Sequence, residues 1–91
     1  MYVVVSYDII DDKRRNKIAK ALLCYGRRVQ KSVFECLLEE KHFLEMKTAI
    51  ENLIDFEHDS VRYYFLCKKC VPAIEISGWG TVSEDEHTII I

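Results

Sequence analysis

The stretch MYVVVSYD, residues 1–8, decides the fold class of this chain. β-Branched and aromatic residues dominate it, and these side chains favour extended backbone. Its apolar residues follow one another almost without interruption, which is typical of a central strand buried on both faces. We therefore predict a central strand over residues 2–8, with Asp8 at its carboxyl end.

Two amphipathic helices are predicted further along the chain, over about residues 13–25 and 41–54. In both segments apolar residues recur at helical spacing and form one buried stripe. Asp11 or Asp12 can accept hydrogen bonds from the free N–H groups that open the first helix. We expect Gly26 to end that helix in the left-handed conformation.

The remaining extended segments are residues 28–39 and 61–67. In the first of them the apolar positions change parity between Val33 and Phe34, which one flat strand would not do, so we expect a bend or a change of strand near Ser32. The resulting order, βαββαβ, is that of an α+β, ferredoxin-like fold with an antiparallel sheet and both helices on one face.

Length and composition fit a single domain over residues 1–91, with 49% hydrophobic and 31% charged residues. The chain shows no export signal and no apolar run that could cross a membrane, so we expect a cytoplasmic protein with reduced cysteines. The three isoleucines of residues 89–91 would form an exposed, aggregating edge unless they pair with something. We expect an additional C-terminal strand in the tail, about residues 77–91.

The charge of the chain is strongly polarised, although its net value is only −2. Residues 11–31 contain eight Lys or Arg against two Asp, a local net charge of +6, whereas residues 32–91 carry −7. Such a distribution offers a cationic surface to a polyanion. The alternative is an uneven surface without a function, as small proteins often have.

Asp8 is the first candidate for chemistry, because a carboxylate at the end of a central strand can point into a loop cleft. One carboxylate, completed by waters and phosphate oxygens, is a normal way to hold magnesium. The alternative for Asp8 is a turn or capping residue. Asp11 and Asp12 are assigned mostly to capping.

The basic residues of the first helix and the following strand are candidates for nucleic-acid binding. In the predicted fold, Arg14, Arg15 and Arg28 are expected near the loop cleft that Asp8 faces. Guanidinium groups can bind a phosphate there with two hydrogen bonds each. The lysines at positions 13, 17 and 20 fall on one helix face, which either binds phosphate or is simply solvated. Tyr7 and Phe34 could stack on a base, with core packing as the alternative.

The motif CKKC, residues 67–70, has the spacing of a zinc half-site or of a redox pair. The other cysteines and the histidines are scattered without ligand spacing, so we expect buried or merely incidental thiols. The sequence contains no glycine-rich phosphate loop and no nucleophile elbow, which excludes nucleotide hydrolases and serine or thiol hydrolases.

Four motifs occur in a specific order: YDI ending the first strand, DDKRRNKIAKALLCYG, RRVQKSVFECLL and DSVRYYFLCKKC. In this combination the chain resembles the Cas-two (Cas2) family, the small CRISPR-associated adaptation proteins. The resemblance covers most of residues 2–70, and the tail carries no matching motif.

The resemblance implies a ferredoxin-like homodimer in which the first-strand aspartates of both subunits face each other and bind a divalent metal. Asp8 is that residue here, as the catalytic and metal-binding position, with magnesium as the expected cofactor. Two carboxylates brought this close repel each other unless a metal or a proton is shared. In this family the C-terminal strand commonly crosses to the partner subunit, which makes residues 77–91 a dimer-swapping tail.

The resemblance also implies a metal-dependent nuclease acting on single-stranded RNA or double-stranded DNA. The positions matching those tied to that activity are Tyr7, Asp8, Arg15, Arg28 and Phe34. Lys17 stands where a second arginine can occur. Lysine keeps the positive charge but lacks the paired N–H donors of a guanidinium group. Ser32 is expected to help place a phosphate.

Two alternatives to a nuclease stay open. Family members bridge pairs of the Cas-one (Cas1) integrase and support new spacer DNA, and the cationic segment suits a purely architectural DNA-binding subunit equally well. A toxin-like messenger ribonuclease is the second alternative, because some such toxins share this fold and size, although RVQKSVFE favours the adaptation family.

Overall fold

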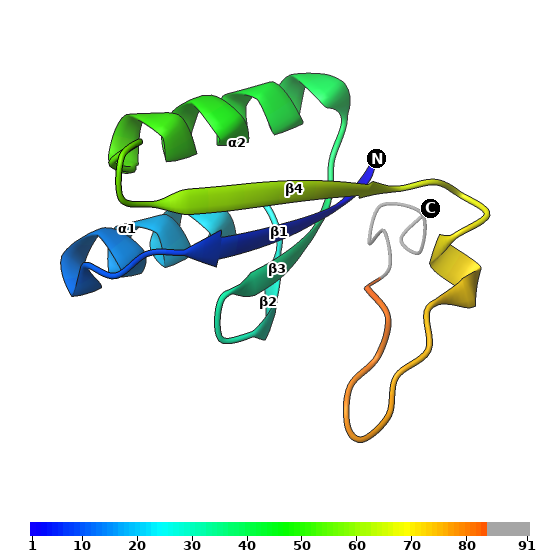
Figure 1. Cartoon of the computed structure of the whole chain (residues 1–91). Helices are drawn as coiled ribbons and strands as arrows, with labels where there is room; N and C mark the ends of the chain where they lie inside the picture. The colour runs from blue at the N-terminus through cyan, green and yellow to red at the C-terminus, as the bar shows by residue number, and fades with distance from the viewer. Residues whose placement is uncertain (84–91) are drawn as a thin grey trace.

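The computed structural model describes residues 1–83. Its elements are β1 (Tyr2–Asp8), α1 (Asp12–Leu23), β2 (Arg27–Gln30), β3 (Val33–Leu37), α2 (Glu40–Leu53), β4 (Ser60–Leu66) and the short 3-10 helix η1 (Val71–Ala73). Figure 1 shows their arrangement. The order βαββαβ confirms the predicted α+β class, and the first strand has the predicted bounds.

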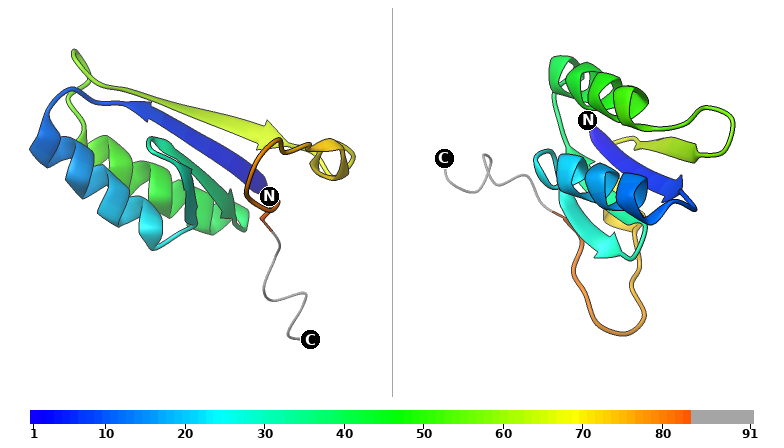
Figure 2. Two further views of the ribbon diagram at one scale, coloured as in Figure 1. Left: turned by 90° about the horizontal axis from the view of Figure 1, so that it is seen from below. Right: turned by 90° about the vertical axis from the view of Figure 1, so that its left-hand side faces the viewer.

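The four strands form one antiparallel sheet in the order β2-β3-β1-β4. β1 is central, as predicted, and pairs with β3 on one side and with β4 on the other. Both helices cover the same face of the sheet, which is clear when the molecule is seen from below (Figure 2). This is the ferredoxin-like arrangement.

The hydrophobic core lies between the helices and the sheet, on what we call the closed face. Its members alternate along the strands, because successive side chains of a strand point to opposite faces. The fully buried core side chains are Val3, Val5, Ile18, Leu22, Phe34, Cys36, Met46 and Ile50. Tyr7 and Ile9 continue this core at the end of β1.

No described helix covers the other face, which we call the open face (Figure 2). By register it carries Tyr2, Val4, Ser6 and Asp8 from β1, Val33, Glu35 and Leu37 from β3, and Ser60, Arg62, Tyr64 and Leu66 from β4; of the β1 residues only Tyr2 is buried. The prediction that both faces of β1 are buried is therefore wrong within the described residues: Asp8 is exposed, and Val4 and Ser6 are only partly buried.

The predicted strand change near Ser32 is confirmed. β2 ends at Gln30, β3 begins at Val33, and the two residues between them form a turn. The pairing is also irregular between Arg28 and Gln30. These two features explain the change in apolar parity.

The predicted cap at the start of α1 is also confirmed, and Asp11 is the residue that provides it. Its carboxylate accepts a hydrogen bond from the backbone N–H of Arg14 at 2.9 Å. The predicted role of Gly26 is wrong, because within the described residues only Gly78 and Gly80 have positive φ. A Cβ at Gly26 would lie 2.4 Å from the carbonyl oxygen of Glu35 and 2.5 Å from Cys36 Sγ, so close approach to β3 explains this glycine.

The chain beyond β4 forms η1 and then returns to the sheet. Arg27 Nε donates to the Ser83 hydroxyl at 2.6 Å, and that hydroxyl donates to the Glu35 carboxylate. Residues 74–83 contain no strand, and the rest of the predicted additional strand, residues 84–91, lies outside the described residues. Across residues 1–83, neither helix has the length and apolar character needed to cross a membrane.

Candidate metal and nucleic-acid site

Asp8 lies at the last position of β1, opposite Ser60 of β4, and its side chain is exposed on the open face. The described residues contain no group of three or more His, Cys, Asp or Glu side chains that could hold a metal ion. Within the described residues, one chain therefore does not gather three such ligands around Asp8. A magnesium ion bound there would need its other oxygen ligands from water, phosphate or a second copy of the chain.

Tyr7 belongs to the closed face, although it is the neighbour of Asp8 in the sequence. Its side chain is 4% exposed, its hydroxyl donates to the carbonyl of Lys31 at 3.2 Å, and it accepts a hydrogen bond from Arg28 Nη2 at 3.1 Å. The expected grouping of Tyr7 and Phe34 beside Asp8 is therefore wrong for the described chain: the sheet separates Asp8 from both aromatic rings, because adjacent strand residues point to opposite faces.

Phe34 is fully buried, at 0% exposure, so its ring is not accessible to a nucleic-acid base. The guanidinium carbon of Arg28 lies 5.5 Å from the centre of this ring, within the range of a cation–π contact. The centre of the Tyr7 ring lies 6.3 Å from the centre of the Phe34 ring. Both rings are therefore packed in the core, which was the alternative to a base contact, and they hold Arg28 at the surface.

Arg14 makes a two-point ion pair with Asp59, in the loop before β4. Its Nε and Nη2 donate to the two carboxylate oxygens at 2.8 and 3.2 Å, and the side chain of Asp59 is fully buried. The Arg14 hydrogen bond is the main reason that the pKa of Asp59 lies below its ordinary value. This partner explains why an arginine is favoured at a helix N-terminus, where the helix dipole disfavours cations.

Arg15 fastens the loop that follows Asp8. Its Nη1 donates to the carbonyl of Ile9 at 3.1 Å and to that of Ile10 at 3.3 Å, while Nη2 pairs with Asp12. The side chain keeps 35% of its surface exposed. Arg15 therefore holds the loop beside Asp8 and still presents charge to the solvent.

The other predicted contact residues, Lys17 and Ser32, lie at the surface. Lys17 is exposed on α1 with Lys13 and Lys20, and Lys31 is exposed in the β2–β3 turn. Ser32 is partly exposed in that turn, and its carbonyl accepts from the backbone N–H of Tyr7 at 3.0 Å. The turn is at the Asp8 end of the sheet because β3 begins opposite the end of β1.

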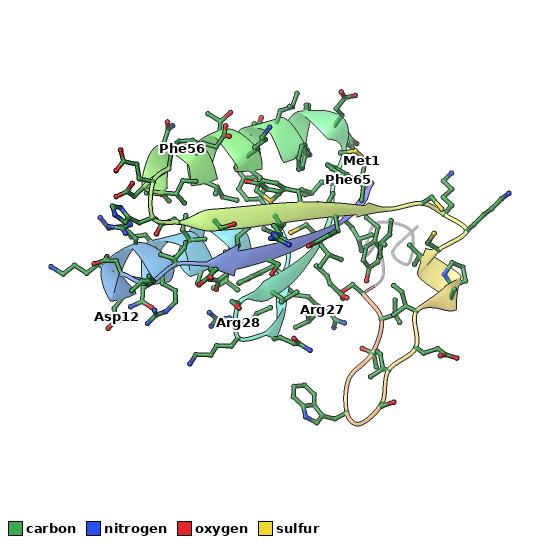
Figure 3. All side chains as sticks on the ribbon, viewed as in Figure 1. Met1, Asp12, Arg27, Arg28, Phe56 and Phe65 are labelled. Carbon is green, nitrogen blue, oxygen red and sulfur yellow. The ribbon has the colours of Figure 1, made fainter. Side chains whose placement is uncertain are left out.

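Two further residues escaped the sequence reasoning. Asp59 was quoted only as the first residue of the motif DSVRYYFLCKKC and was given no role, although a carboxylate just before a strand was its signal. Arg27 pairs with Glu35 and Ser83 on the open-face side of β2, whereas Arg28 supports the closed-face group. Figure 3 shows both arginines along the β2 edge of the sheet.

Comparison with known proteins gives a consistent result. The family model for CRISPR associated protein Cas2 matches residues 1–74. The chain is 46% identical to "CRISPR-associated endoribonuclease Cas2 1" of Chloroflexus aurantiacus, with 100% of this chain and 99% of the relative aligned. It is 40% identical to "CRISPR-associated endonuclease Cas2 2" of Thermus thermophilus, over 88% of this chain and 84% of the relative.

Solved structures agree with the family match. The crystal structure of Streptococcus pyogenes Cas2 at pH 6.5 superposes with a TM-score of 0.77 at 37% identity, over 86% of this chain and all of that one. A chain of a partial Cas6-RT-Cas1–Cas2 complex superposes with a TM-score of 0.73 at 26% identity, over 82% of each chain. This chain therefore belongs to the CRISPR associated protein Cas2 family.

Proposed function

We propose that this chain acts in CRISPR adaptation as a homodimer that binds nucleic acid together with the Cas1 integrase and hydrolyses phosphodiester bonds with magnesium at Asp8. The observation that carries the proposal is the exposed carboxylate of Asp8 at the carboxyl end of the central strand, on a sheet face that no described helix covers. The names of the relatives, endoribonuclease and endonuclease, support the reaction class.

Dimerisation through the open face would complete the metal site. This face holds partly buried apolar side chains, among them Val4, Val33 and Leu66, and the larger Tyr64, which is 47% exposed. Apolar side chains on an uncovered sheet face gain stability when a second layer covers them. A second open face packed on the first would bring two Asp8 carboxylates to one interface.

Asp8 fits magnesium in its chemistry, because a carboxylate oxygen is the hard ligand that this ion prefers. Bound magnesium would polarise a phosphate oxygen and lower the pKa of an attacking water. The chain's own part is to hold the carboxylate at a rigid strand end. Arg15 contributes by fixing the next loop through the carbonyls of Ile9 and Ile10.

The cations at the same end of the molecule are proposed to bind phosphates. Arg28 is exposed and is held in place by Tyr7 and Phe34, so its guanidinium is preorganised for a phosphate. Lys17 and Lys31 add positive charge, and their flexible side chains can reach a phosphate from several directions. Ser32 is proposed to place a phosphate in the turn. Arg14 is engaged by Asp59, so we assign it to the support of this end of the fold.

The second candidate function is a purely architectural DNA-binding subunit of the integrase complex. Two observations favour it: the described residues contain no cluster of three or more possible metal ligands, and the cations suit sequence-independent backbone contacts. In this case Asp8 would shape only the end of β1 and the dimer interface.

Cleavage assays separate the two functions. The purified chain is incubated with labelled single-stranded RNA and with duplex DNA, in magnesium or in chelator, beside Asp8→Asn and the control Glu57→Gln. Glu57 is an exposed carboxylate in the loop before β4, so its substitution controls for lost surface charge. We expect cleavage that requires magnesium, disappears in Asp8→Asn and survives in Glu57→Gln.

The opposite result is equally informative. If no substrate is cut, while the wild type and Asp8→Asn bind duplex and Cas1 equally well, then the catalytic proposal fails and the architectural function stands. Cleavage that persists in Asp8→Asn at the wild-type rate would assign the activity to other residues or to a contaminant.

A further inference from the structure

Cys67 and Cys70 lie in a tight turn directly after β4. The backbone N–H groups of Cys70 and Val71 both donate to the carbonyl of Cys67, at 3.0 and 3.2 Å. The two sulfur atoms are 3.1 Å apart, and both cysteines are exposed. The motif is therefore an exposed pair of adjacent thiols, and the expectation that they are buried is wrong.

The backbone of this turn already suits a disulfide bond. A four-residue turn closed by a hydrogen bond keeps its end Cα atoms within about 7 Å. Disulfides span Cα distances of about 4.4 to 6.8 Å, so the sulfur atoms can join by side-chain rotation alone. The turn has ordinary backbone conformations, since no described residue other than glycine has positive φ.

The two sulfur atoms differ in reactivity. The hydrogen-bonding contact between the two sulfur atoms is the main cause that lowers the pKa of Cys67. The same contact raises the pKa of Cys70. The turn also places the backbone N–H groups of Lys69 and Cys70 at the Cys67 sulfur, where they stabilise a thiolate. Because the thiolate is the attacking species in exchange reactions, this geometry favours Cys67 as the nucleophile and Cys70 as the resolving thiol.

The surroundings of the pair select the reaction partner. Lys68 and Lys69 separate the cysteines and are both exposed, so the turn carries two positive charges. The open, convex position admits a small molecule without a preformed pocket. The site also lies at the opposite end of the sheet from Asp8, because β4 runs antiparallel to β1 (Figure 1).

We propose that Cys67 and Cys70 form a reversible dithiol–disulfide site that exchanges with low-molecular-weight disulfides, and with anionic ones in preference to cationic ones. The site is independent of the nucleic-acid function proposed above. It lies where the chain leaves the sheet for residues 71–83.

The exchange proceeds in two steps. The Cys67 thiolate attacks one sulfur of the small disulfide, forms a mixed disulfide and releases one small thiolate. The Cys70 sulfur, losing its proton, then attacks Cys67 Sγ, closes the internal disulfide and releases the second small thiol. The protein loses two electrons, the small disulfide gains them, and the two protein thiol protons end on the two released thiols.

Alkylation followed by intact-mass and peptide-mass analysis tests this proposal. The reduced full chain is mixed with oxidised glutathione, which is anionic, or with cystamine, which is cationic, and is then quenched by alkylation over a time course. We expect both thiols of residues 67–70 to be lost together, faster with glutathione disulfide than with cystamine. Reduced glutathione in excess should restore them.

Three variants make the result specific. Cys70→Ser should stop at a glutathione adduct on Cys67, and Cys67→Ser should react several-fold more slowly than the wild type. Lys68→Gln combined with Lys69→Gln should remove the preference for the anionic disulfide. Cys24→Ser is the control, since Cys24 is an exposed thiol with no described cysteine partner, and it should leave the closure of the internal disulfide unchanged.

Other outcomes overturn the proposal. A stable mixed disulfide in the wild type, without the internal bond, would show that the turn does not close. Reaction of Cys67 no faster than that of Cys24 would show that the pair is not activated. Bound zinc that protects both thiols until a chelator is added would make the motif a metal site instead.

Discussion

The two faces of the sheet differ in what their residues do, although they are built from the same strands. On the closed face Val5, Tyr7 and Phe34 are buried beneath the helices, and on the open face Val4, Ser6 and Asp8 remain partly or fully accessible. Adjacent residues such as Tyr7 and Asp8 therefore have different roles. This difference shows that residues of one continuous sequence motif can lie on opposite faces of the sheet and serve different functions.

The largest effect on stability is expected for Phe34→Ala on the closed face. Removing a fully buried aromatic ring typically costs about 3–5 kcal/mol. Urea unfolding of the wild type and the variant, at one low protein concentration, measures this loss. Tyr64→Ala on the open face is the matched variant, and its loss of unfolding free energy should be less than half that of Phe34→Ala. Equal losses would mean that aromatic residues on the two faces contribute equally to stability.

Arg14→Gln should produce the next largest effect, with a distinct pH dependence. The native pKa of Asp59 lies below its ordinary value of 3.8, chiefly because of the Arg14 hydrogen bond. The ionised carboxylate therefore stabilises the native state at pH values above 3.8, and this contribution is lost as the pH falls through the lower native pKa. The melting temperature of Arg14→Gln should be clearly lower than that of the wild type near pH 7, and the gap should narrow in acid.

Arg28→Gln serves as the control for this measurement, since Arg28 makes no ion pair with a carboxylate within the described residues. Its melting temperature should follow that of the wild type more closely at every pH. A gap for Arg14→Gln that stays constant from neutral pH into acid would show that the Asp59 carboxylate is not its cause.

Arg28→Gln should have a moderate effect on binding rather than on stability. A lost phosphate contact reduces the slope of log K against log salt by about 1 for duplex DNA. Fluorescence anisotropy with labelled duplex at several salt concentrations measures this slope. Arg14→Gln should leave the slope nearly unchanged, because its guanidinium is engaged by Asp59; a slope reduced equally in both variants would restore Arg14 as a phosphate contact.

The smallest expected effect is that of Asp8→Asn on dimerisation, a few-fold tightening of the proposed homodimer in chelator. Two carboxylates that face each other across an interface repel, and the amide removes that repulsion without changing the shape of the side chain. Sedimentation equilibrium measures the dimer constant, and magnesium should reduce the difference between wild type and variant. A dimer dissociation constant that changes neither with Asp8→Asn nor with magnesium would place Asp8 away from the interface.

Local patterns predicted much of the fold correctly. The bounds of β1, the cap at Asp11 and the strand change near Ser32 all follow from residues that are neighbours in the chain. Hydrogen-bond capping and strand alternation act over a few residues, so a sequence shows them directly. The family resemblance, which was inferred from sequence motifs, is confirmed by the family model that matches residues 1–74.

The candidate site was less predictable, because its contacts join distant parts of the chain. Arg14 meets Asp59 across 45 residues, and Arg28 meets Tyr7 across 21. Gly26 was assigned to a left-handed turn, whereas its position is explained by the approach of β3. The burial of Phe34 likewise depends on both helices packing on the same face.

By itself, the sequence determined the element order, the central place of β1, the cationic segment and the family. Only the tertiary structure decided which of the adjacent residues Tyr7 and Asp8 is accessible, which arginines are free for phosphate, and that Cys67 and Cys70 form an exposed pair. The physical reason is the range of the interactions. Periodicity and capping are local, whereas burial and ion pairing depend on where the whole chain places its other parts.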